Sequence, residues 1–202
     1  MYPLGVLKKK QLKILKLTFT GNIVNEASTA SNTLIYPDGT VSIVGNKLNF
    51  NGSSDCSVQI EQLGGSDWFN LQRGFDLKFD LVINTSSPTG GIVHIIDSSQ
   101  TSFFQLQYEN TGNGVLQLIL GGQPSTNFAT SALFGAIPKG TLLSIKIEYR
   151  RTSAKLYINS VLAVDATGFL QRTNIIRDLW LGGAWVGNTI VGSMDNVEMT
   201  FL

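Results

Sequence analysis

Apolar and polar residues alternate along most of the chain with a period of two. Residues 75–83, 104–108, 115–120 and 197–201 place an apolar side chain at every second position, and most of the side chains between them are polar. This period is that of a β-strand with one buried side and one solvent-facing side. Short segments rich in Gly, Asn, Asp and Pro separate the alternating runs. Strands at such short intervals predict an all-β sandwich or barrel.

Residues 141–168 show the pattern most fully. Alternation over 143–150 is followed by a polar break, a second apolar run that ends at Ile158, a corner of Asn159 and Ser160, and a third apolar run. This order predicts three consecutive strands joined by short turns.

Helical periodicity does not extend over three turns anywhere in the sequence. The best helical candidate, residues 128–134, is short, and we expect a loop there with one helical turn. Residues 15–19 and 197–201 each have a clear apolar side, and the first and last strands of a sandwich often pair. We therefore expect a single domain over residues 11–202, preceded by an arm of residues 1–10.

Composition supports a folded domain with a weakly charged surface. Hydrophobic residues make up 43% of the 202-residue chain and charged residues 14%, whereas charged residues make up about 25% of ordinary soluble domains. Ser, Thr and Asn together supply 50 of the 202 residues. Such a surface is suited to hydrogen bonding or to being covered by other subunits, so the oligomeric state stays open.

The net charge of +1 predicts no general attraction to nucleic acid. Basic residues nevertheless gather near the start of the chain, where five of the fifteen lie within nine positions: Lys8, Lys9, Lys10, Lys13 and Lys16. Such a cluster can bind phosphate or another anionic surface. Two interpretations follow, a solvated arm that leads into the first strand or an arm that docks on a larger assembly.

The single cysteine, Cys56, excludes an intrachain disulfide and is expected to be a small core residue. The first twenty residues lack the pattern of a signal peptide, because their lysines follow the short apolar start and no small-residue cleavage site comes after them. No run approaches the roughly 18 apolar residues of a membrane span. We expect synthesis in the cytoplasm without a signal peptide, which is also how virion proteins are made.

Three groups of packing and turn residues follow one another in an order that resembles a known family. Residues 141–163 form the predicted hairpin, and residues 69–85 form a predicted core strand. The positions that match before the core strand are Gly45, Lys47, Phe50, Gly52 and Ser53. Those that match after the hairpin are Leu179, Leu181, Gly182 and Gly183, followed by Gly192, Asp195 and Val197. Together they resemble the laminin-G-like branch of the concanavalin A-like lectin/glucanase superfamily.

The resemblance implies a jelly-roll β-sandwich of two antiparallel sheets. It covers most of the chain, but its motifs concern packing and turns and carry no chemistry. Two positions depart from the family pattern: the usual turn glycine is Ser160, and a frequent Trp-His pair reads Leu143 and Ser144. The alternation of apolar residues survives both changes, so the expected fold is the same.

The sequence does not indicate catalytic carboxylates. Glucanases of this superfamily carry Glu-x-Asp-x-x-Glu on one strand, and a retaining pair must lie about 5–5.5 Å apart. Here Asp195 and Glu198 are three positions apart, and this odd spacing predicts opposite faces of a strand. Asp76 and Asp80 share a face with Lys78 between them, as on a charged solvent face. We expect no enzyme, with a divergent glycan hydrolase as an alternative because carboxylates can meet across strands.

The sole histidine, His94, offers a second route to chemistry. A Ser-His-Asp arrangement with Asp97 can be drawn, but no Gly-x-Ser-x-Gly motif supports it. Ile92, His94 and Ile96 fall on one face of a strand, so we expect a core or sheet-face histidine.

The resemblance also implies that a calcium ion can bind at the rim of the sandwich, held by Asp, Asn and backbone oxygens. Asp97, at the end of a predicted strand, is the first candidate ligand, with Asn188 or Asp38 as its partner. The family's aspartate pair has no clear counterpart here. We therefore expect no cofactor, with a bound calcium ion as the alternative.

Aromatic and amide side chains are the candidates for ligand binding. A ring can cover the apolar face of a pyranose while amides bond to its hydroxyl groups. Trp68 and Trp185 lie in glycine-rich, loop-like contexts, where they either bind a ligand or fold over the sandwich edge. Trp180 lies inside a strand, in the core or on an outer face. Polar side chains that are either a binding surface or plain solvent face complete the predicted site: Gln105, Gln107, Arg150 and Asn188.

The leading hypothesis is a non-enzymatic module that binds a cell-surface glycan, in adhesion at a virion or cell surface. The second is a structural protein of a bacteriophage virion, a capsid decoration or tail-fibre component that docks on other virion proteins through Lys8, Lys9, Lys10 and Lys13. The two are compatible, and the third is the divergent hydrolase.

Overall fold

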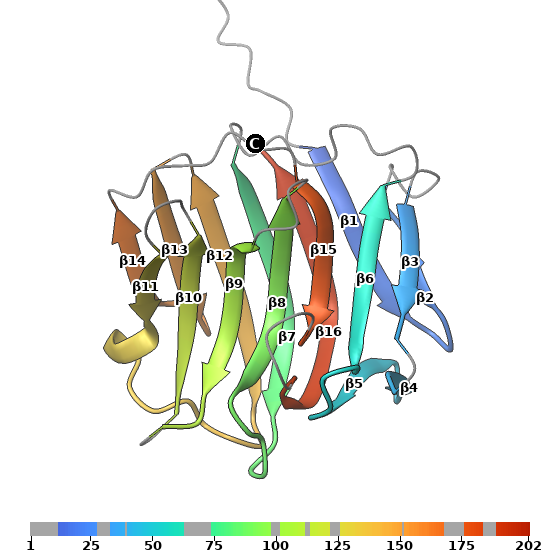
Figure 1. Cartoon of the computed structure of the whole chain (residues 1–202), viewed down its shortest axis with the longest axis horizontal. Helices are drawn as coiled ribbons and strands as arrows, with labels where there is room; N and C mark the ends of the chain where they lie inside the picture. The colour runs from blue at the N-terminus through green and yellow to red at the C-terminus, as the bar shows by residue number, and fades with distance from the viewer. Residues whose placement is uncertain are drawn as a thin grey trace, which may run out of the picture.

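The fold is a sandwich of two antiparallel sheets, as the alternation predicts (Figure 1). The computed structural model describes residues 12–27, 33–38, 40–62, 74–97, 102–111, 114–121, 126–150, 152–167, 176–183 and 189–202. In Figure 1 the seven-stranded sheet lies in front of the nine-stranded sheet.

The nine-stranded sheet contains both ends of the described chain. Its strands run in the order β14 (Val161–Thr167), β13 (Ser153–Ile158), β12 (Leu142–Arg150), β7 (Phe75–Ile83), β16 (Val191–Phe201), β1 (Leu12–Phe19) and β2 (Ile23–Asn25). Strand β5 (Lys47–Asn51) pairs with the first part of β16, and β4 (Ser42–Val44) pairs with β5. The pairing of β1 with β16 confirms that the first and last predicted strands are neighbours.

The seven-stranded sheet is built from the middle of the chain. Its order is β11 (Thr126–Thr130), β10 (Val115–Gly121), β9 (Ser102–Glu109), β8 (Gly90–Asp97), β15 (Ile176–Gly182), β6 (Ser57–Gln62) and β3 (Thr33–Pro37). Alternate residues of both sheets form one buried hydrophobic cluster that extends from Ile14 to Met199. Cys56 belongs to this cluster, as expected.

An aromatic cluster joins the two sheets inside the core. Phe75 and Tyr149 are cross-strand neighbours in the nine-stranded sheet and stack with ring centroids 5.1 Å apart. Phe104, from the seven-stranded sheet, meets both rings edge-on at 5.9 and 6.1 Å. Burial raises the pKa of the Tyr149 phenol. These large side chains fill the interior where the two sheets face each other.

Residues 128–134 combine a strand end with a helical turn. Strand β11 extends to Thr130, where it pairs with Gln117 of β10, and a single 3₁₀ turn follows over Ser131–Leu133. The predicted helical turn is confirmed. The sequence did not predict strand β11, because its residues do not alternate between apolar and polar.

Two glycines of the family-like motifs allow close approach between backbones. Gly182 has φ +96°, and a Cβ there would lie 2.6 Å from the Cys56 carbonyl oxygen. A Cβ at Gly192 would lie 2.0 Å from the Val82 carbonyl oxygen. These motifs are therefore explained by packing, as the sequence indicates.

Candidate functional site

The predicted polar site residues divide between two outer faces. Gln105 and Gln107 lie on β9, whose intervening residues Phe104 and Leu106 enter the core, so both amides face outward from the seven-stranded sheet. Arg150 ends β12 and faces outward from the nine-stranded sheet. The structure therefore does not bring Arg150 together with the two glutamines, because the core separates their strands.

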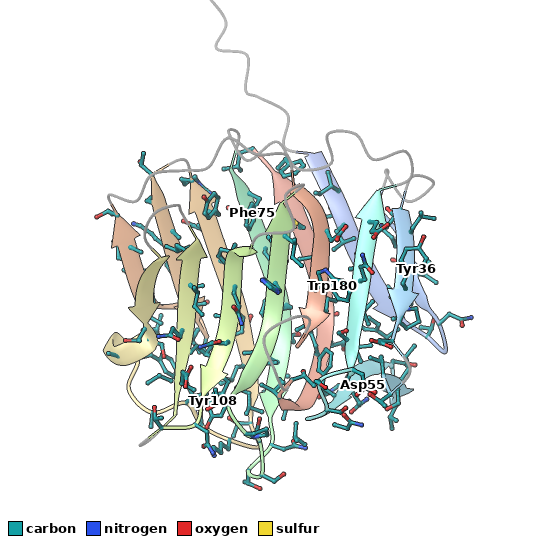
Figure 2. All side chains as sticks on the ribbon, viewed as in Figure 1. Tyr36, Asp55, Phe75, Tyr108 and Trp180 are labelled. Carbon is teal, nitrogen blue, oxygen red and sulfur yellow. The ribbon has the colours of Figure 1, made fainter. Side chains whose placement is uncertain are left out.

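Trp180 occupies the centre of the outer face of the seven-stranded sheet. Its neighbours Leu179 and Leu181 are fully buried in the core, so the indole points away from it. The register places Trp180 opposite His94 of β8 and Gln59 of β6. Figure 2 shows Trp180 midway across this sheet and Tyr36 at its β3 edge. Of the two positions that the sequence allows for Trp180, the structure has the outer face.

An ordered row of amides lies on the same face, on β9 and β10, beyond the β8 strand that borders this tryptophan. Gln105 is the cross-strand partner of His94, and its Nε2 donates to Gln107 Oε1 at 3.1 Å. Gln107 Nε2 donates in turn to Gln117 Oε1 at 2.7 Å and to the Glu109 carboxylate. This chain of bonds holds the Gln107 and Gln117 amides in fixed orientations.

The centre of this face is sheltered although it faces away from the core. His94 is 2%, Gln105 4% and Asp178 5% exposed, which agrees with the sheet-face histidine that the sequence predicts. The indole Nε1 of Trp180 is closed to solvent and has no hydrogen-bond acceptor within the part of the chain that the structure describes. A buried donor without an acceptor costs roughly 1–3 kcal/mol.

The outer face of the nine-stranded sheet carries a network of charges. Arg150 Nη2 lies 2.8 Å from Asp76 Oδ1, an ion pair without a well-aligned hydrogen bond. Lys146 binds the carboxylate of Glu148. The hydrogen bond from Lys146 is the main cause of the lowered pKa of Glu148, and the same bond raises the pKa of Lys146.

Asp195 and Glu198 lie on the same face, so the prediction of opposite faces was wrong. Asp195 is opposite Asp80 of β7 and Glu198 is opposite Lys78, with a register shift between the two pairs. Asn196, at φ +51°, forms the β-bulge that absorbs the extra residue.

The bulge also brings two carboxylates to neighbouring positions across strands. Asn196 Nδ2 donates to Asp80 Oδ2 at 2.7 Å, and its backbone N donates to Asp195 Oδ1 at 2.8 Å. Both carboxylates therefore help to hold the bulge. Among the described residues no group of three or more His, Cys, Asp or Glu side chains is placed to hold a metal ion.

Two adjacent hollows open on this outer face. The larger, of about 390 Å³, lies over β7, β12 and β13 and is lined by Lys78, Ser144, Ile145, Lys146, Tyr157 and Ser160. The smaller, of about 110 Å³, includes Lys47, Asp80, Ser193, Asp195 and Asn196 in its lining. Ser144 of the larger lining and Asp80 of the smaller lining are cross-strand partners in β12 and β7.

Several predicted site residues lie outside the described part of the chain. They are Trp68, Trp185, Asn188, Lys8, Lys9 and Lys10. Asp97 ends β8, but its side chain is not among those described, and its suggested partner Asp38 is exposed. Lys13 belongs to β1, where its ammonium lies 2.8 Å from Glu198 Oε1. It is therefore a strand residue with a partner on the same sheet.

Sequence reasoning did not single out Tyr157, Ser160 and Lys78 as site residues. The only signal was the polar side of the alternation, which cannot show that a sheet face is hollowed. No helix within the described ranges is long and apolar enough to span a membrane.

Comparison with family models and with curated proteins gives no match. Solved structures do match. The receptor-binding domain of botulinum neurotoxin C/D mosaic serotype has a TM-score of 0.71 at 15% identity, over 93% of this chain and 47% of that chain. The binding domain of Paraclostridial Mosquitocidal Protein 1 gives 0.71 at 12% identity, over 93% and 48%.

A third structure is the binding domain of Botulinum Neurotoxin DC in complex with SialylT, with a TM-score of 0.70 at 13% identity, over 94% of this chain and 47% of that chain. The chain spans about half the length of these structures. At such identities the likeness shows the fold, a β-sandwich that occurs in binding domains.

Proposed function

We propose that the chain is a non-enzymatic carbohydrate-binding module that binds a saccharide on the outer face of the seven-stranded sheet. The carrying observation is the position of Trp180, an outward-facing indole at the centre of a face that also carries amides, His94, Tyr36 and the acidic residues Glu61 and Asp178.

The chemistry of this face suits a sugar. An aromatic ring packs on the apolar C–H face of a pyranose, while amides both donate to and accept from its hydroxyl groups. The bonds from Gln105 to Gln107 and from Gln107 to Gln117 already orient these side chains. Little side-chain entropy is then lost when a ligand binds.

The fold likeness supports this proposal in a limited way. Similar solved structures are named as receptor-binding or binding domains, one of them in complex with SialylT. Because this chain matches less than half of each, the named ligand is not assigned to the matched part. The proposal therefore rests on the Trp180 face. Adhesion at a virion or cell surface, and docking through Lys8, Lys9 and Lys10, stay predictions.

Trp180→Ala tests the proposal. A glycan array followed by titration calorimetry on the best ligand should show binding by the unmodified chain and at least tenfold weaker binding by the variant, about 1.4 kcal/mol. Val161→Ala, an exposed residue of β14 in the opposite sheet that lines neither hollow, is the control and should keep the affinity for that ligand.

Gln107→Ala provides a second variant that removes no ring from the sheet, in case Trp180→Ala does not fold. We expect it to weaken binding with a smaller effect on thermal stability. The proposal is rejected when the unmodified chain binds no glycan, or when folded Trp180→Ala and Gln107→Ala both bind as tightly as the unmodified chain.

A further inference from the structure

We propose that the larger hollow over β7, β12 and β13 is a second, independent binding site, which takes the oxyanion of an acidic saccharide. The shared chemistry is a carboxylate or sulfate group on a sugar. The site lies on the opposite outer face from Trp180, so it does not depend on the function proposed above.

Two lysines supply the positive charge of this hollow. Lys78 and Lys146 are direct cross-strand partners in β7 and β12, and like charges at such positions repel each other. The lining includes both lysines and no acidic residue. Lys146 is already paired with Glu148, so a bound anion would gain most of its attraction from Lys78.

The surrounding carboxylates are already engaged. Glu148 binds Lys146, and Glu198, which is the partner of Lys78 across β16, lies 2.8 Å from the ammonium of Lys13. Asp80 accepts from the neutral Asn196 amide, keeps its charge, and belongs to the lining of the smaller hollow. Within the described ranges Lys78 makes no ion pair and is exposed, which leaves its charge available to a ligand.

The rest of the lining favours a sugar as the carrier of the anion. Tyr157 offers a ring, with Lys146 Nζ 5.5 Å from its centroid, and Ser144 and Ser160 offer hydroxyl groups. Ile145 is buried in the core, so the hollow has no aliphatic side chain that could hold a lipid tail. A volume of about 390 Å³ is within the range of roughly 300–1,000 Å³ for small-ligand sites.

The adjoining smaller hollow can receive the hydroxyl groups of the same ligand. Asp80 and Asp195 contribute carboxylates there, and carboxylates accept hydrogen bonds from hydroxyl donors. A ligand with an oxyanion at one end and hydroxyl groups at the other matches both hollows. A bare anion would leave the smaller hollow empty.

The rim of the larger hollow is held in place by the β13–β14 turn. Asn159 N donates to the Ser144 carbonyl at 2.8 Å, and Asn159 Oδ1 accepts from Ser144 N at 2.9 Å. These two bonds fix Ser144 beside the turn that carries Ser160. The hydroxyl-bearing residues therefore stand in position before any ligand binds.

Three trisaccharide or disaccharide probes test the inference: lactose, 3′-sialyllactose and 3′-sulfated lactose. By calorimetry at low salt, we expect at least one acidic probe to bind fivefold or more tightly than lactose. Binding of 3′-sialyllactose alone identifies a carboxylate site, and binding of 3′-sulfated lactose alone identifies a sulfate ester site. Equal affinity for all three probes overturns the inference.

Variants locate the effect. Lys78→Gln should lower the affinity for the acidic probe fivefold or more and reduce its dependence on NaCl between 50 and 500 mM, because added salt screens charge. Lys155→Gln is the matched control, since Lys155 lies on the same face but pairs with Asp165 at 3.5 Å and does not line the hollow. Equal affinities for the two variants overturn the inference.

Two further measurements test whether an effect comes from a loss of folding or from binding at the Trp180 face. Lys78→Gln should unfold at a urea concentration close to that of the unmodified chain, because Lys78 is exposed and lies between Lys146 on one side and Glu198 on the other. Trp180→Ala should keep the preference for the acidic probe. Loss of that preference in Trp180→Ala, with Lys78→Gln unchanged, would place the acidic ligand on the seven-stranded sheet and overturn the inference.

Discussion

Ser160 stands out among the described residues with a positive φ outside glycine. Its φ is +66°, and the other such residues are all asparagines, Asn46, Asn159 and Asn196. Asn tolerates the left-handed region because its short side chain can bond locally, whereas serine does so less readily. Asn159 and Ser160 together form a two-residue hairpin turn with both φ values positive, for which the preferred sequence is Asn-Gly.

Ser160→Gly should therefore stabilise the protein. Glycine adopts the required φ without a steric penalty, so we expect a gain of about 1 kcal/mol in the free energy of unfolding, measured by urea denaturation. Asn159→Gly is the contrast, because it gives up the hydrogen bond from Ser144 N and should be no more stable than the unmodified chain. Equal or lower stability of Ser160→Gly would contradict this account of the turn.

At the scale of single elements, β16 organises the nine-stranded sheet. Its first part pairs with β5 and its last part with β1, while β7 pairs with it along the opposite edge. The bulge at Asn196 lets the strand serve both partners while Met194, Val197 and Met199 still reach the core. A strict two-residue period would have sent part of this strand's apolar set outward.

Gly192→Ala tests how closely β16 and β7 approach. A methyl group there would lie 2.0 Å from the Val82 carbonyl oxygen, so the strands must separate and lose pairing. We expect a loss of about 3 kcal/mol or failure to fold, at the upper end for overpacking, read by thermal denaturation.

Gly135→Ala is the matched control for backbone conformation alone. Its φ is +84°, but a Cβ would meet nothing within 4 Å. Its cost should be about 1 kcal/mol, from the left-handed conformation. A Gly192→Ala protein as stable as Gly135→Ala would show that the two strands are not held at this distance.

At the scale of the whole molecule, one aromatic cluster couples the two sheets. Phe75 stacks on Tyr149 within its own sheet and meets Phe104 of the other sheet edge-on. Phe75 is fully buried, so its removal leaves a cavity at the junction. Both outer faces, with the Trp180 surface and the lysine-lined hollow, depend on this shared interior.

Phe75→Ala should lower the free energy of unfolding by about 3–5 kcal/mol. Because the residue touches both sheets, the loss should appear in a single transition, with far-UV circular dichroism and tryptophan fluorescence changing together. Phe75→Leu should cost less, since it fills part of the space. Two separate transitions would indicate that the sheets unfold independently.

Much of the fold and part of the candidate surfaces follow from the sequence. Alternation placed Gln105 and Gln107 outward, Cys56 was expected in the core, and the terminal strands were expected to pair. The turn at Asn159 and Ser160 could also be predicted, because these two polar residues stand between two apolar runs. These features are local, or depend only on which side of a strand a residue occupies.

The tertiary structure alone decided how these sides combine. A period of two determines which residues share one side of a strand, but not which sheet the strand joins. The strand order therefore decided that Arg150 and Gln105 lie on different sheets. Register decided that Lys78 opposes Lys146 and that Trp180 lies between His94 and Gln59. Pairing is set by contacts between residues distant in sequence, which a local pattern does not contain. The two proposed binding surfaces are products of that register.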